Sequence, residues 1–225
     1  MIKFENVTKK FPLGNLALAE VSFDIEDKEF IFLVGPSGAG KTTILKLILR
    51  ESLPTDGTIL VDDFDITSNQ FTQVEILRRK IGMIFQDFKI LFDKSVFENI
   101  ALSLKVIGLP EDQIKNQVEE ALDLVSLSKK ALAFPVQLSA GEIQRIAIAR
   151  AIVGDRDIIL ADEPTGNLDP KTAWEIMKIF KKLEKTKTIL FATHNTDIVN
   201  SFQKRVLVLN QGKLTKDHRK GGYDI

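Results

Sequence analysis

The 225-residue sequence has no cysteine and no excess of either charge. Without cysteine the chain can form neither disulfides nor thiolate metal sites, so the reducing cytosol is its simplest setting. Its 31 lysine and arginine residues balance its 31 aspartate and glutamate residues, and no net field draws it towards nucleic acid or an anionic membrane. We therefore expect no nucleic-acid partner, and any charged partner has to be recognised locally.

Long apolar runs and a secretory start are lacking as well. Residues 1–6 include the acidic Glu5 and are not followed by a long apolar stretch, which argues against a signal peptide. The best apolar candidate, residues 44–49, is interrupted by Lys46 and is far shorter than the roughly 18 residues that span a bilayer. We expect an intracellular protein whose membrane contact, if it has any, comes through a partner.

What the sequence does contain is the succession of strand patterns and helix patterns that is typical of a globular α/β protein. Hydrophobic residues make up 44% of the chain, enough for a sizeable core in one or at most two domains. Residues 1–30 alternate apolar and polar side chains, which predicts antiparallel strands with one wet face. Continuous apolar runs instead predict parallel strands buried on both faces, and they occupy residues 30–34, 158–161 and 188–192.

Helical spacing fills the stretches between these strands. Residues 88–132 contain no convincing buried strand, so we interpret them as a helical subdomain inserted into the α/β core. The tail from Lys213 to Ile225 is polar and is expected to be loosely held. Apolar side chains recur on one helical face at Ile114, Val118, Ala121, Leu122 and Val125, and at Trp174, Met177, Phe180 and Leu183.

A glycine-rich loop lies between the first buried strand and an apolar helix pattern. Its Gly-x-x-x-x-Gly-Lys-Thr spacing and this context predict a phosphate-binding loop for ATP, the alternative being a plain glycine-rich turn. Glycines let the backbone wrap the phosphates beside the partial positive charge of a helix N-terminus. Lys41 supplies a point charge for the outer phosphates and Thr42 a hydroxyl for Mg²⁺. The loop comprises Gly35, Pro36, Ser37, Gly38, Ala39, Gly40, Lys41, Thr42 and Thr43.

Two carboxylates end the apolar run 158–161. Because open α/β sheets bind ligands at the carboxyl ends of their strands, Asp162 is expected to bind Mg²⁺, directly or through water. Glu163 is expected to orient or deprotonate the attacking water. An acidic pair alone is more typical of a solvated turn or a helix cap. The phosphate loop upstream favours the catalytic interpretation.

Four further motifs lie along the chain: Gln86 after residues 81–85, residues 138–142 at the start of a helix pattern, residues 166–169, and His194 after the apolar run 188–192. Together with the phosphate loop and the acidic pair, their order and spacing resemble those of the ATP-binding subunits of ABC transporters over essentially the whole chain. The resemblance implies a P-loop NTPase of ABC ATPase type, with a mixed central sheet, an N-terminal antiparallel β part and an inserted helical subdomain. A single domain, residues 1–225, would consist of a core (1–87 and about 133–225) and a helical part (about 88–132). The motifs are Gln86 in the Q-loop, the signature 138–142 at the subdomain boundary, the D-loop 166–169 and the switch histidine His194.

The resemblance also implies catalytic and metal-binding roles. Glu163, His194 and Gln86 would act on the γ-phosphate and the attacking water. Gln86 would join Thr42 and Asp162 at the Mg²⁺ ion, since a neutral amide offers both a donor and an acceptor. Taken singly, a histidine at a strand end is more often structural.

Two more residues would contact the nucleotide. Phe11 matches the aromatic residue that stacks on adenine, although a core phenylalanine is the alternative in a chain with 15 phenylalanines. Asp169 belongs to the D-loop and would lie at the nucleotide as well.

The signature motif would act on a second copy of the chain. Ser139 and Gly141 match the residues that bind the γ-phosphate of the nucleotide held by the other copy, so that two chains form an ATP sandwich. Two positions depart from the usual pattern, because Ala140 replaces a glycine and Glu142 a glutamine. The added methyl group of Ala140 puts the tightness and rate of the sandwich in question.

Residues 85–91 and 96–101 closely resemble one branch of the family, and so does the Gly-Gly-Tyr tail. The ATPase of that branch acts in cell division. That branch implies an integral membrane partner, docked on the helical subdomain and the Q-loop region, and a peripheral place on the cytoplasmic face of the cell membrane. The complex would control cell-wall hydrolases. We expect most members of an apolar cluster to form the subdomain core and one or two to be exposed for docking. The cluster comprises Phe88, Leu91, Phe92, Val96 and Phe97.

Two alternatives stay open. In the first, the ATPase energises the export or release of a lipid, lipoprotein or peptide. In the second, which belongs to another class, the chain is a nucleotide-dependent scaffold with negligible turnover.

Overall fold

The computed structural model describes residues 1–12, 14–219 and 221. The chain divides into two compact units, one formed by Met1–Arg78 with Lys187–Ile225 and the other by Arg79–Thr186. The chain thus leaves the first unit and returns to it. The boundaries near residues 88 and 132 that the sequence suggests differ from this division and stay a prediction.

An antiparallel sheet in the first unit confirms the prediction for residues 1–30. Its strand order is β2-β1-β4-β5, and β1 pairs antiparallel with both β2 and β4. On its buried face Phe4 stacks on its cross-strand neighbour Phe23, with ring centroids 4.5 Å apart. The strands are β1 (Ile2–Lys10), β2 (Leu16–Ile25), β4 (Asp56–Val61) and β5 (Phe64–Asp65).

The buried strands of the first unit are parallel, as their apolar runs predict. Strand β3 (Phe30–Val34) pairs in parallel with β8 (Thr188–Thr193) and with β9 (Arg205–Asn210). Every residue of β3 and β8 is buried. The helices of this unit are α1 (Lys41–Ile48) and α7 (Thr196–Phe202), and α2 (Val74–Lys80) spans the boundary to the second unit.

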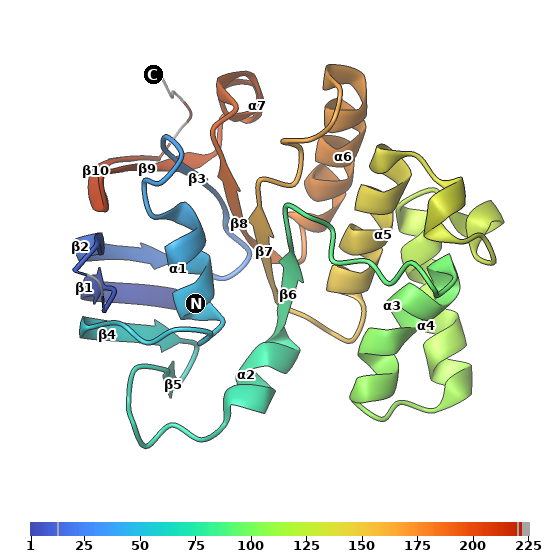
Figure 1. Cartoon of the computed structure of the whole chain (residues 1–225), viewed down its shortest axis with the longest axis horizontal. Coiled ribbons are helices and arrows are strands. Elements are labelled where there is room, and N and C mark those ends of the chain that lie inside the picture. Colours follow the sequence, from blue (N-terminus) through green and yellow to red (C-terminus); the bar gives the residue numbers. More distant parts are fainter. Residues whose placement is uncertain (13, 220, 222–225) are drawn as a thin grey trace. The chain divides into compact units, whose positions relative to one another are not determined.

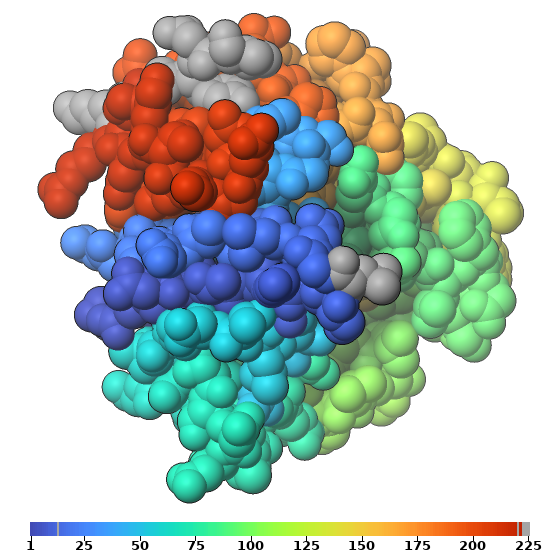
Figure 2. All heavy atoms as spheres, turned by 60° about the vertical axis from the view of Figure 1, so that its left-hand side comes forward, coloured from blue at the N-terminus to red at the C-terminus, as the bar shows by residue number. Residues whose placement is uncertain are grey.

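The prediction of a loosely held tail is wrong for residues 213–218. They form β10 (Lys213–His218), which pairs antiparallel with β9. Arg205 of β9 binds Asp217 of β10 through two hydrogen bonds of 2.8 and 2.7 Å, and this bidentate contact fixes the edge strand. Figure 2 shows β9–β10, β1–β2 and β4 as successive bands on one face of this unit. Residues 222–225 lie outside the described part of the chain.

The second unit combines two parallel strands with helices (Figure 1). Strand β6 (Ile81–Ile84) pairs in parallel with β7 (Ile158–Asp162). Residues 88–132, all of them described, contain helices and no strand, as predicted. The helices are α3 (Val96–Val106), α4 (Glu111–Leu124), η1 (Ser128–Lys130), η2 (Pro135–Gln137), α5 (Ala140–Ile152) and α6 (Pro170–Leu183).

The two predicted helical stripes differ in accuracy. Helix α4 buries the predicted residues Ile114 and Val118, which confirms its stripe. In α6 the stripe is wrong at Trp174, which is 38% exposed, because the buried face runs through Ala173 and Ile176 instead. None of the helices in the described residues has the length and apolar character required to cross a bilayer.

Candidate nucleotide-binding site

The glycine-rich loop joins β3 to α1, as the sequence predicts. Gly40 is the residue before the helix and has φ 111°, a left-handed conformation that disfavours side chains. A Cβ atom there would lie 2.8 Å from the Ala17 carbonyl oxygen, so the neighbouring backbone also excludes one. The rim residues Pro36, Ser37 and Gly38 are exposed. The rim of the loop is therefore open to solvent.

The start of α1 suits an anion. No side chain caps the helix at Gly40, and its first turn contains no acidic residue. Backbone N–H groups at such an end lack helical partners and carry partial positive charge. Lys41 is only 7% exposed, and its Nζ donates to the carbonyl oxygens of Gly35 at 2.7 Å and Pro36 at 3.2 Å. Thr42 is exposed in the same turn and Thr43 partly so.

The turn between β9 and β10 is hydrogen-bonded to the phosphate loop. The Gly212 N–H donates to the Ala39 carbonyl oxygen at 3.1 Å, and the Gly212 carbonyl accepts from Ala19 N–H at 2.8 Å. The first bond links the loop to this turn, and the second links the turn to β2. Sequence reasoning missed Gly212, because both of its backbone contacts are with residues far away in the chain.

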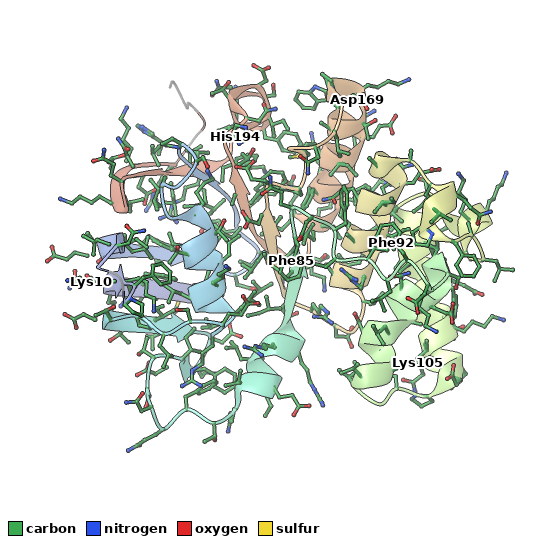
Figure 3. The ribbon with its side chains drawn as sticks, viewed as in Figure 1. Lys10, Phe85, Phe92, Lys105, Asp169 and His194 are labelled. Carbon is green, nitrogen blue, oxygen red and sulfur yellow. The ribbon has the colours of Figure 1, made fainter. Side chains whose placement is uncertain are left out.

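His194 belongs to the same sheet edge as the loop. In the parallel pairing of β3 and β8, Val34 lies opposite Thr193. His194 and Gly35 therefore both follow the carboxyl ends of neighbouring strands. His194 is exposed there (Figure 3), and the next residue, Asn195, caps α7 by accepting from Ile198 N–H at 3.1 Å.

The acidic pair ends β7 in the second unit. Asp162 is 8% exposed and Glu163 is partly exposed. Glu163 has φ 47°, a left-handed conformation that costs a glutamate about 1–3 kcal/mol. Such strain concentrates at functional sites, where the surrounding fold maintains it. Here the Gly166 N–H donates to the Glu163 carbonyl oxygen at 3.1 Å and closes the turn.

Gln86 follows the neighbouring strand of the same unit. Ile84 of β6 lies opposite Ala161 of β7, so the segments after both strands begin at one edge. Gln86 is exposed, and its carbonyl oxygen accepts from Asn167 Nδ2 at 3.4 Å. This bond links the Q-loop to the D-loop. Asn167 was part of a motif in the sequence, but its contact had no sequence signal.

The segment after Gln86 is fixed by polar side chains that the sequence did not single out. Phe88 and Lys89 both have positive φ, of 60° and 50°. The Arg150 guanidinium donates to their carbonyl oxygens at 2.9 and 2.6 Å. Fully buried Asn99 donates to the Leu91 carbonyl oxygen and accepts from the Leu91 N–H, each at 2.9 Å.

The apolar cluster near this segment is divided between core and surface. Val96 is fully buried, and Phe88 and Phe97 are partly exposed. Leu91 is 39% exposed, and Phe92, labelled in Figure 3, is 58% exposed. Two members are thus exposed, which is the expected number, but only one is fully buried, so the expectation that most of the cluster forms the core is wrong. A docking role for the exposed pair stays a prediction.

The signature motif begins α5. Ser139 caps the helix and Glu142 forms the reciprocal bond of a capping box. Hydrogen bonds from Lys130 and Ser139 hold the pKa of the Glu142 carboxyl at about 2. Ala140 is an exposed residue of the helix itself, a position at which the backbone has no need of glycine.

Gly141 and Asp169 have structural partners besides their predicted nucleotide contacts. A Cβ atom on Gly141 would overlap the Thr172 Cγ2 atom, so glycine permits close packing of α5 on α6. Asp169, labelled in Figure 3, caps α6 by accepting from Thr172 N–H at 3.1 Å. Hydrogen bonding from Thr172 also lowers the pKa of the Asp169 carboxyl.

Phe11 lies on the surface, and the core alternative is wrong. The ring is 39% exposed in the turn between β1 and β2, and Lys9 Nζ lies 5.3 Å from its centroid. Two backbone bonds, from Phe11 N–H to the Asn15 carbonyl and from Gly14 N–H to the Phe11 carbonyl, shape this turn.

Comparison with known proteins gives the class of this chain. The family pattern described as ABC transporter matches residues 18–166, a span that includes the phosphate loop, the signature motif and the acidic pair. The chain belongs to the ABC transporter family. It has the ATP-binding cassette fold of that family, a P-loop NTPase fold with mixed α/β sheets.

Two individual relatives are similar to this chain over nearly its whole length. The cell division ATP-binding protein FtsE of Bacillus subtilis is 48% identical, over 99% of this chain and 98% of the relative. FtsE of Escherichia coli is 44% identical, over 95% and 97%.

Solved structures of ABC transporter cassettes have the same fold as this chain. The dimeric structure of MJ0796, a bacterial ABC transporter cassette, has a TM-score of 0.88 and 35% identity, over 99% of this chain and 100% of the cassette. A dimeric post-hydrolysis state of that cassette bound to ADP and Pi gives the same TM-score at 34% identity.

Proposed function

We propose that this chain is the Mg²⁺-dependent ATPase subunit of an FtsEX-like membrane complex that acts in cell division. The observation that carries the proposal is the phosphate loop between β3 and α1, with an uncapped helix start and a nearly buried Lys41. The full-length similarity to FtsE proteins supports the cell-division role.

The first unit would bind the nucleotide. Backbone N–H groups of residues 35–43 would hold the phosphates, and Lys41 would turn from the loop carbonyls to the outer phosphates. Phe11 would stack on the adenine, for which its exposed ring is suited.

Mg²⁺ would be held by Thr42, Gln86 and Asp162. One carboxylate in this set is in keeping with Mg²⁺ sites in phosphoryl-transfer enzymes, which rely largely on substrate phosphates and water. When bound, the ion would neutralise charge on the phosphate oxygens.

The second unit would supply the general base. Glu163, in its strained turn at the end of β7, would orient or deprotonate the attacking water. Gln86 would position that water through its amide, and His194 would donate to the γ-phosphate. Asp169 would act at the nucleotide while capping α6.

Hydrolysis would require a second copy. Ser139 and Gly141 at the start of α5 would bind the γ-phosphate of the nucleotide on the other chain. The dimeric cassettes among the structural relatives support this arrangement. Closing and reopening would follow from contacts made only while the γ-phosphate is present.

The membrane partner would be an FtsX-like integral subunit. Exposed Leu91 and Phe92, beside the segment fixed by Arg150, would form part of the docking surface. The chain would then be a peripheral protein on the cytoplasmic face of the membrane. It would be attached through this docking surface and not through a net charge drawn to the membrane. Nucleotide-driven movement would pass through this surface to the partner and regulate cell-wall hydrolysis.

The test is to change Glu163→Gln and measure mass by sedimentation with saturating ATP and Mg²⁺. Removing the base while keeping the shape should stop hydrolysis and leave an ATP-dependent dimer. A variant that stays monomeric would count against the ATP sandwich.

Lys41→Ala is the companion variant. We expect its ATPase rate, measured with the membrane partner present, to fall by at least about 100-fold because the phosphates lose their point charge. A rate that this change leaves untouched would contradict the enzymatic role and favour the nucleotide-dependent scaffold.

A further inference from the structure

The signature helix α5 holds a carboxylate in its own first turn. Glu142 Oε2 accepts from the Ser139 N–H at 2.9 Å and from the Ser139 hydroxyl at 3.1 Å. Ser139 Oγ accepts in return from Glu142 N–H at 3.3 Å. A phosphate arriving at this helix N-terminus would seek the same donors. The hydroxyl proton of the signature serine is therefore directed to Glu142 before any nucleotide arrives.

Lys130 binds the other oxygen of this carboxylate. Its Nζ lies 2.6 Å from Glu142 Oε1. Lys130 ends η1, and its carbonyl oxygen accepts from Ala133 N–H at 3.0 Å. The Ala133 carbonyl in turn accepts from Val96 N–H at 2.9 Å at the start of α3. The ammonium group thus comes from a backbone segment that is itself anchored.

Charge makes this pair significant for nucleotide binding. With a pKa of about 2, Glu142 is anionic at neutral pH. The γ-phosphate of ATP is anionic too, so an unpaired carboxylate beside Ser139 would repel it. The ammonium group of Lys130 balances the charge of Glu142 at this position.

We propose that Lys130 is a positioning residue of the ATP sandwich. It neutralises Glu142 and gives its carboxylate a permanent partner, so that Ser139 can redirect its hydroxyl hydrogen bond to the γ-phosphate held by the second copy. This inference rests on the proposed function. A glutamine at position 142 would have no need of the ammonium group, because a neutral amide does not repel phosphate. Lys130 and Glu142 therefore act as a matched pair.

The experiment uses the Glu163→Gln chain as parent and measures ATP-driven dimerisation by sedimentation. Lys130→Met should raise the dimer dissociation constant by about tenfold or more, because it leaves a carboxylate uncompensated beside phosphate. Adding Glu142→Gln to Lys130→Met should restore dimerisation to within about threefold of the parent, since it removes the repulsion. The defect of Lys130→Met should also shrink at high salt.

A matched control comes from the same unit. Lys105 pairs with Glu111 at 3.2 Å on the surface, and Lys105→Met removes a similar ion pair away from the signature motif (Figure 3). It should leave dimerisation unchanged. Binding of a fluorescent ATP analogue to the monomer should be equal in all variants, because the phosphate loop is intact.

The outcomes separate the two proposals. If Lys130→Met dimerises like the parent, or if Glu142→Gln fails to rescue it, the role of Lys130 is overturned while the sandwich stands. If the parent itself stays monomeric with saturating ATP and Mg²⁺, the sandwich fails and this inference fails with it. Rescue by Glu142→Gln would exclude a merely structural role, since that change cannot restore a missing ammonium group.

Discussion

At Gly40, the backbone conformation of the phosphate loop and its ability to bind phosphate both depend on the absence of a side chain. Gly40→Ala would place a methyl group at φ 111°, 2.8 Å from both the Ala17 carbonyl oxygen and Leu18 Cδ2. Strain and overlap together should lower the free energy of unfolding by about 2–4 kcal/mol. The displaced loop should also bind ATP at least about tenfold more weakly. Urea denaturation and ATP titration would measure the two effects.

Gly108→Ala separates strain from overlap. Gly108 also has positive φ, of 79°, but a Cβ atom there would have no heavy atom within 4 Å. Only the left-handed backbone should matter, at about 1–2 kcal/mol, and ATP affinity should not change. Equal losses of stability in the two variants would show that the packing of the loop against β2 is unimportant.

Single residues differ in how far sequence could predict them. Lys41 and Glu163 belong to motifs whose spacing reflects their chemistry, so their positions at a loop and a strand end were predictable. Lys130, Thr172 and Gly212 gave no such signal, because each acts through a contact with a residue distant in the chain.

At the scale of elements, the starts of α5 and α6 meet at Gly141 and Thr172. Gly141→Ala should lower the free energy of unfolding by about 1–3 kcal/mol, because its Cβ atom would overlap the Thr172 methyl group. Thr172→Ser removes that methyl group and should recover about half of the loss or more. The measurement is a double-mutant cycle of urea denaturation, with Thr172→Ser alone as the control. Strictly additive effects would contradict the contact.

Edge elements were the hardest to predict. Residues 213–218 are polar and mostly exposed, so their sequence resembles a loose tail. They form a strand because β9 offers its free edge and because Arg205 binds both Asp217 and Glu29. Buried strands such as β3 were predictable because burial on both faces requires a continuous apolar run.

For the whole molecule, nucleotide should act on stability by mass action. ATP with Mg²⁺ at 100 times its dissociation constant should raise the free energy of unfolding by about 2.7 kcal/mol. In the Glu163→Gln chain the Tm should also rise with protein concentration, because the dimer is broken on unfolding. Thermal denaturation at several protein concentrations would test this.

The control for this prediction is Lys41→Ala, which should lose most of the nucleotide-dependent shift. A Tm of the Glu163→Gln chain that rises with ATP but not with protein concentration would indicate binding without a sandwich.

The sequence by itself determined the class of the protein. Buried strands require apolar runs, and phosphate binding requires glycines, a lysine and a hydroxyl at fixed spacing. The strands and the phosphate loop can therefore both be predicted from the sequence. Only the tertiary structure decided what surrounds those motifs: Gly212 behind the phosphate loop, Arg150 on the Q-loop segment, and Lys130 on Glu142. These are pairwise contacts across many residues, and no local pattern encodes them.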